Sequence, residues 1–293
     1  MKKALAVVDE HIKDGRFQRS LSLVAALSSF VSGLEVSYEH YKGSYSNPVM
    51  YSPVLLSGVL TGAAIAGFFS RRAAERVLRW ISALTLADGI IGFGFHIRGI
   101  QRKPGGWRLP LTNIIIGPPI FAPLLFGTAA YLGFIASYLR REEDSKQTCE
   151  SPYRGWRRDL NEGRFQKHLC GVTAAWTLFS GVEAWYSHYK SRFHIWSQWL
   201  PVLLAPIQFG ACIGGILSER VARRVLPTAS AVATVNGTIG FFYHARGIVR
   251  RPGRTRHWLY NILYGPPIFA PLLFSACGAL GLLASVLRRE GRD

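Results

Sequence analysis

Three titratable side chains recur in this chain at a fixed spacing, inside segments that are otherwise apolar. The recurring pairs, each 148 positions apart, are Glu35 and Glu183, His40 and His188, and His96 and His244. Imidazole nitrogens ligate metals and relay protons, and a carboxylate inside a membrane helix is costly enough to suggest a function. The spacing therefore predicts a metal or proton site that is present twice.

Each recurring histidine has a glycine on its own helical face. Gly33 precedes His40 by seven residues and Gly92 precedes His96 by four, and both intervals return to the same side of a helix. Two facing imidazoles would bind a metal ion or the iron of haem b, and the missing side chains would leave room for a flat macrocycle. The remaining members of the predicted site are Arg98 as a propionate partner, and Gly181, Gly240 and Arg246 in the second copy.

In its spacing this arrangement resembles that of b-type cytochromes. The resemblance implies a haem between the two histidines of each copy. Two other interpretations stay open from the residues alone. The glycines could serve helix packing while the histidines bond interfacial water or lipid headgroups, or the histidines could relay protons.

The recurring glutamate has its own alternatives. Glu35 and Glu183 are expected to face the bundle interior as a proton acceptor or metal ligand, and a protonated carboxyl that bonds a neighbouring helix is the structural alternative. A site of two histidines and one carboxylate is a further variant. In a straight helix it is disfavoured, because five residues place Glu35 about 140° around the axis and roughly 7 Å deeper than His40.

A ten-residue stretch is identical in the two copies, at 117–126 and 265–274. Its prolines remove amide donors near one end of an apolar segment, so the helix should break there and line a cofactor or quinone pocket. A plain helix start explains the first two prolines but not the third. The prolines assigned to the pocket are Pro118, Pro123, Pro266 and Pro271.

The 148-residue offset runs through nearly the whole chain and predicts a tandem duplication. We expect a first four-helix membrane repeat at 1–145, a cytoplasmic linker at 146–160 and a second four-helix repeat at 161–293. The apolar segments, four in each repeat, are 21–41, 50–69, 77–97, 111–139, 169–189, 198–217, 225–245 and 259–287. Each is long enough to cross a bilayer as a helix. The predicted fold is an all-α integral membrane protein with eight transmembrane helices in two parallel four-helix bundles.

The net charge of +18 suits membrane orientation better than nucleic-acid binding, because Lys and Arg concentrate in connectors on one side. That side should be cytoplasmic and should hold both termini. We therefore expect a multi-pass protein of the cell inner (plasma) membrane that binds lipid but no nucleic acid. The four cysteines have neither disulfide nor metal-site spacing.

Two functions are compatible with these features. The first is a membrane subunit of a respiratory-type, multisubunit electron-transfer complex, with a haem, metal or quinone site near the outer face of each repeat and a periplasmic or membrane partner. In architecture this is similar to two-bundle quinone-reactive membrane anchors. The second is a proton-coupled transporter or channel. The first is favoured because the inner half of each bundle is expected to be purely apolar. The sequence leaves open whether the protein is itself an enzyme.

Overall fold

The computed structural model describes residues 16–138, the first half, and residues 165–287, the second half. Within both ranges all regular structure is helical, and no strand occurs there. The helices of the first half are α2 (Phe17–Lys42), α3 (Ser52–Phe69), α4 (Arg79–Gln101), α5 (Pro110–Ile116) and α6 (Ala122–Ala136). The predicted linker 146–160, which includes Cys149, lies outside the described residues.

The second half has the same order of elements. Its helices are α8 (Phe165–Lys190), α9 (Trp199–Leu217), α10 (Glu219–Arg224), α11 (Leu226–Val249), α12 (Trp258–Leu263) and α13 (Ala270–Leu287). Both ends of α8 lie 148 positions after those of α2, and α13 begins 148 positions after α6. The elements therefore recur at the same offset as the residues.

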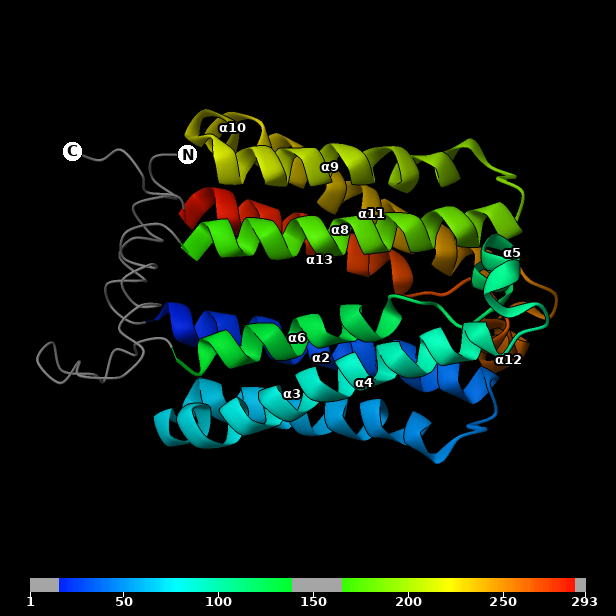
Figure 1. Ribbon diagram of the computed structural model, residues 1–293, viewed down its shortest axis with the longest axis horizontal. Coiled ribbons are helices and arrows are strands. Elements are labelled where there is room, and N and C mark those ends of the chain that lie inside the picture. Colours follow the sequence, from blue (N-terminus) through cyan, green and yellow to red (C-terminus); the bar gives the residue numbers. More distant parts are fainter. Residues whose placement is uncertain (1–15, 139–164, 288–293) are drawn as a thin grey trace, which may run out of the picture.

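The four long helices of each half pack as a ring. In the first half α2 and α4 each contact α3 and α6, and in the second half α8 and α11 each contact α9 and α13. The first and third long helices of each half thus face each other across the ring. We call the end of the molecule that carries α5 and α12 the outer end, and the end where α2 and α8 begin the inner end (Figure 1).

A segment of each half contacts the other half at the outer end. The outer arms, residues 102–121 and 250–269, link the third and fourth long helices of each half. In the first arm α5 contacts α8, and in the second arm α12 contacts α2; Figure 1 shows α5 beside α8. One buried cluster also joins residues of both halves, including Leu21 and Leu169. Each arm therefore contacts both halves.

The proline element breaks the fourth long segment as expected. The predicted run 111–139 divides into α5 and α6, and 259–287 divides into α12 and α13. Pro118 and Pro119 have no amide hydrogen and disfavour a helical conformation in the residue before each of them, so the helix cannot continue through this stretch. Gly117 accordingly has an extended backbone, with φ −84° and ψ −173°.

Four helical segments of the described chain are long and apolar enough to cross a membrane: Phe17–Lys42, Pro48–Phe69, Ala73–Gln101 and Trp196–Leu217. Ala122–Ala136 and Ala270–Val286 are apolar but shorter. Large apolar side chains also point outward, for example Leu55 at 67% exposed and Leu217 at 80%, which suits contact with lipid. The all-helical class is confirmed for the described residues, and the four candidate spans are consistent with a membrane protein. The eight spans, the two-domain division, the kind of membrane and the side that holds the termini stay predictions.

Candidate functional site

The helix break in each outer arm is held by a recurring histidine. His96 Nδ1 lies 2.6 Å from the carbonyl oxygen of Pro119, and His244 Nδ1 lies 2.6 Å from that of Pro267. A carbonyl only accepts hydrogen bonds, so Nδ1 carries the proton and donates it. In the neutral ring Nε2 then keeps its lone pair.

The other two recurring histidines show the same arrangement. His40 Nδ1 lies 2.6 Å from the Met50 carbonyl, and His188 Nδ1 lies 2.8 Å from the Gln198 carbonyl. No described residue forms a hydrogen bond with Nε2 of any of the four rings. Metal-binding histidines commonly donate their second ring N–H to a carbonyl, because that bond fixes the tautomer and raises the basicity of the ligating nitrogen.

The histidines form one pair in each half. His40 on α2 and His96 on α4 come from helices that face each other across the ring, and they are near enough to interact electrostatically. His188 and His244 do the same in the second half. The described residues contain no group of three or more His, Cys, Asp and Glu side chains that could hold a metal. The variant with two histidines and one carboxylate is therefore not assembled, and each site offers two imidazoles.

The glycines near the histidines are occupied by helix contacts. A Cβ on Gly33 would collide with the Ser57 side chain, and one on Gly181 would collide with Ala205. A Cβ on Gly92 would lie 3.2 Å from Pro123, and one on Gly240 would lie 3.0 Å from Pro271. These glycines permit close helix packing, so the expected room for a macrocycle is not found beside them.

The remaining predicted members divide into packed and exposed residues. Pro118 packs on Gly99, where an added Cβ would lie 3.1 Å from the proline ring, and Pro266 packs on Gly247 at 3.2 Å. Arg98 and Arg246 are exposed at the outer end. These prolines therefore pack against the third long helix at the helix break. The two arginines lie near the break but are exposed.

The recurring glutamates cross to the opposite half. Glu183 on α8 accepts a hydrogen bond from the backbone N–H of Phe121 at 2.9 Å and also interacts with the Ala122 amide. These amides open α6 in the first half, where a carboxylate is favoured by the helix dipole. The site thus combines a histidine from one half with a glutamate from the other.

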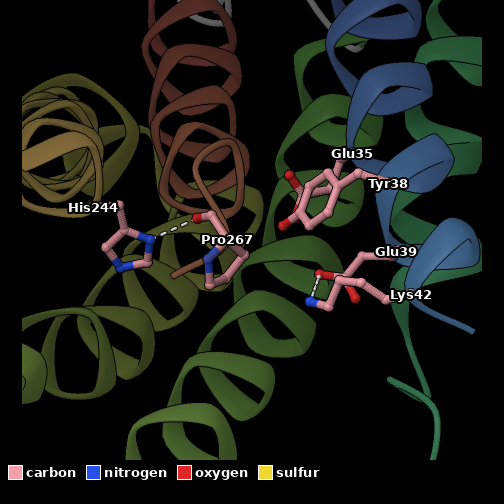
Figure 2. A network of polar contacts seen from close by, with 6 residues as sticks. All are labelled: Glu35, Tyr38, Glu39, Lys42, His244 and Pro267. Atoms are coloured by element: carbon pink, nitrogen blue, oxygen red, sulfur yellow. Dashed lines mark hydrogen bonds and ion pairs between the residues drawn. The ribbon is translucent and has the colours of Figure 1, made fainter. Parts of the chain in front are cut away.

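Glu35 on α2 mirrors Glu183. Its carboxylate accepts a hydrogen bond from the Tyr38 hydroxyl at 2.8 Å and interacts with the backbone amide of Phe269, just before α13. Figure 2 shows Glu35 and Tyr38 pointing from α2 toward the segment that carries Pro267, whose carbonyl is bonded by His244. The prediction that both glutamates lie at the level of the breaks agrees with this placement, whereas their chemical role stays a prediction.

A buried asparagine holds each outer arm. Asn113 Nδ2 donates to the carbonyls of Pro104 at 3.1 Å and Gly106 at 2.7 Å. Asn261 does the same with Pro252 and Arg254. Both side chains are 1% exposed. The arms are therefore pinned at their own turn as well as at the break.

A polar stripe in the bundle interior was missed by the sequence analysis. Its members, at most 8% exposed, are Gln18, Ser22, Ser29 and Ser32 on α2, and Gln166, Cys170, Thr173, Thr177 and Ser180 on α8. The expectation that the inner half of each bundle is purely apolar is wrong. The signal was a polar residue at every third or fourth position of an apolar run, which marks one helical face.

No family model, no curated protein and no solved structure matches this chain. The function is therefore inferred from the site residues.

Proposed function

We propose that the chain is an integral membrane subunit of an electron-transfer complex, with one histidine-pair metal centre near the outer face of each repeat. The finer fold belongs to this proposal: eight membrane-spanning helices in two parallel four-helix repeats, with both termini cytoplasmic. It is supported by helix bounds that recur at the 148-residue offset and by the apolar length of four of the segments.

One observation carries the proposal. In each half two imidazoles come from helices that face each other across the ring, and both have Nδ1 held by a carbonyl. In all four neutral rings the Nε2 lone pair is therefore left for a ligand. Interfacial histidines that only bonded water or lipid would have no need of the same fixed tautomer at four positions.

The donor set favours haem iron, which takes two axial imidazoles and needs no third protein ligand. A metal ion that keeps water in its other positions is the alternative. The packed glycines leave no room for a macrocycle beside them, and the Nε2 atoms of the four histidines would be the ligands of any bound iron. A bound iron would supply one-electron transfer. The chain's own residues hold the ring orientation, and Arg98 and Arg246 provide cations for propionates.

Quinone is a second cofactor compatible with this level of the membrane. The breaks, Glu35 and Glu183 lie where a quinol could bind, and a carboxylate could take up a proton released on quinol oxidation. A periplasmic or membrane partner subunit would exchange the electrons.

The test is metal analysis and an absorption spectrum of the purified full chain. We expect two centres per chain, one centre in His96→Ala, and none in the His96→Ala, His244→Ala double variant. His168→Ala is the control, because His168 is exposed near the inner end and has no counterpart in the other half. A wild-type protein without metal or haem would overturn the proposal, as would full metal content in the double variant.

The polar stripe favours a second candidate, a proton-coupled transporter or channel. It supplies the polar groups in the inner half that such a path requires. Proteoliposomes with a pH-sensitive dye inside distinguish the two functions. Proton flux driven by a membrane potential, in a protein that contains no metal, would select transport over electron transfer.

A further inference from the structure

The polar stripe leads from the inner end of each half to its recurring glutamate. On α8 its members step by three or four residues from Gln166 to Ser180, and Glu183 follows one turn later. Residues three apart are neighbours on a helix surface. Glu183 lies 17 positions after Gln166, a separation of about 25 Å at 1.5 Å per residue, and the hydrocarbon core is about 30 Å thick.

Several polar atoms of the stripe are buried without a partner among the described residues. They are Gln18 Oε1, both side-chain polar atoms of Gln166, and the hydroxyl of Thr173. The Thr177 hydroxyl has only the weak Cys277 thiol on α13 beside it. Their side chains are at most 1% exposed. Leaving one such group unpaired costs about 1–3 kcal/mol, and bound water is the usual partner for buried polar groups.

The stripe faces the bundle interior and not the lipid. Ser29 donates to the Ser57 carbonyl on α3 at 2.9 Å. Ser180 Oγ lies 3.9 Å from Cys277 Sγ on α13. Water bound to the unpaired atoms would therefore lie between helices, where neighbouring hydroxyl groups continue the chain of donors and acceptors.

We propose that the stripe is a hydrated proton path from the inner surface to Glu35 in the first half and to Glu183 in the second. A hydronium ion at the inner surface passes a proton to the first bound water. Each water or hydroxyl then accepts one proton and donates another, and the carboxylate takes the last one. Release follows the same path in reverse. The proposal does not depend on what the histidines bind.

The surroundings of both glutamates suit a proton-accepting end point. Glu35 interacts with Tyr38, Glu39 and Lys42 of its own helix, and with the Phe269 amide from the opposite arm. Its Oε2 atom is buried and has no hydrogen bond among the described residues. Glu183 interacts with Tyr186 on its own helix and with the amides that open α6. Backbone amides at the helix break of the opposite half therefore lie beside each carboxyl group.

Infrared spectroscopy of the full chain tests the path, because a protonated carboxyl has a C=O stretch that shifts in D2O. A Glu35→Gln background leaves Glu183 as the reporter, and adding Glu183→Gln assigns its band. In this background we expect Thr177→Val to slow exchange of the Glu183 proton about tenfold, a change of ~1.4 kcal/mol in the barrier. Thr177→Ser should keep the wild-type rate, since it retains the hydroxyl and copies Ser29 of the first half.

The opposite background supplies the control. In Glu183→Gln protein Glu35 reports on the α2 stripe, and Thr177→Val should leave its exchange unchanged. Equal Glu183 exchange rates in Thr177→Val and Thr177→Ser would overturn the path. So would a spectrum without any band that Glu183→Gln removes, because the carboxyl would then never be protonated. Metal content is measured on the same samples, so failure of the histidine centre is seen separately.

Discussion

The two halves agree at their outer ends and differ in their interiors. Each outer end has the same break, the same histidine-to-carbonyl bonds and a glutamate that reaches the other half. The buried polar residues of the two interiors lie at different positions. Where the second half has Thr173, Gln208, Cys212 and Cys277, the first half has Ala25, Leu60, Ala64 and Ala129. Where the first half has the buried Ser57 and Thr85, the second half has Ala205 and Ala233.

The difference indicates which features both halves must satisfy. At the outer ends, side chains form hydrogen bonds with the backbone groups that the helix break leaves unpaired in both halves. Replacing one of these side chains would leave a buried polar group unpaired. Interior positions outside the polar stripe only need to fill space and to satisfy their own polar groups. In the second half Gln208 Nε2 donates to Ser230 Oγ at 3.0 Å, while the equivalent Ser82 hydroxyl in the first half has no partner among the described residues.

Contacts between the halves are also unequal. Trp176 Nε1 donates to the Leu124 carbonyl at 3.2 Å, and Phe179 stacks on Phe121 with ring centroids 4.3 Å apart. The equivalent positions on α2 are Ser28 and Val31. The second half therefore contacts Phe121 and the start of α6 in the first half through two side chains that have no equivalent on α2.

The largest expected effect is a difference in stability between equivalent glycine-to-alanine substitutions on α4 and α11. A Cβ on Gly237 would lie 2.5 Å from both the Pro271 oxygen and the Ser275 nitrogen. A Cβ on Gly89 would lie 2.8 Å from the Pro123 oxygen, and its next neighbour, Gly127, is at an ordinary 3.7 Å. We expect Gly237→Ala to destabilise by ~3 kcal/mol and Gly89→Ala by ~1 kcal/mol, the range for overpacking. Thermal unfolding in detergent measures both, and equal melting temperatures would contradict the asymmetry.

The next effect compares the two crossing glutamates. Glu183→Ala leaves the Phe121 amide without its charged acceptor and should cost ~2 kcal/mol, a usual value for a hydrogen bond to a charged group. Glu35→Ala should cost about half as much, because the main hydrogen bond of Glu35 comes from Tyr38 on its own helix. The apparent melting temperatures of the two variants check this order. If Glu35→Ala lowered the melting temperature more than Glu183→Ala, the expected order of the two contacts between the halves would be wrong.

A smaller effect sharpens the comparison between the arms. Trp176→Phe keeps an aromatic ring but removes the hydrogen bond to Leu124, so we expect a loss of ~1 kcal/mol. The control is Trp80→Phe, because Trp80 is 72% exposed and should tolerate the change. Limited proteolysis of the first outer arm, together with thermal unfolding, would report the loosening. Identical behaviour of the two variants would show that the Trp176 hydrogen bond contributes nothing.

The smallest effect concerns the interior. Gln208→Leu with Ser230→Ala removes both partners of one hydrogen bond, and such paired replacements are close to neutral. Gln208→Leu alone leaves Ser230 unpaired and should cost ~1 kcal/mol. Unfolding of the single and double variants measures the difference. If the double variant were less stable than the single one, Gln208 and Ser230 would make stabilising contacts besides their mutual hydrogen bond.

The repeat, the helices and the proline break could be predicted because they depend on local patterns. An apolar run long enough for a membrane predicts a helix wherever it occurs, and consecutive prolines interrupt one in any context. The histidines and glutamates stood out because they recur at one offset. The polar stripe was overlooked, although Gln18, Ser22 and Ser29 carried its period, because small hydroxyl residues in an apolar helix commonly bond their own backbone.

The amino-acid sequence by itself determined the all-helical class, the apolar segments long enough to cross a membrane, the proline breaks and the residues that recur. Only the tertiary structure decided the partners of those residues. Glu183 bonds an amide 62 positions away, and His96 bonds a carbonyl 23 positions away. The physical reason is that helix periodicity specifies only which side chains share a face of a helix. The residues that this face contacts depend on how the helices and the outer arms pack together.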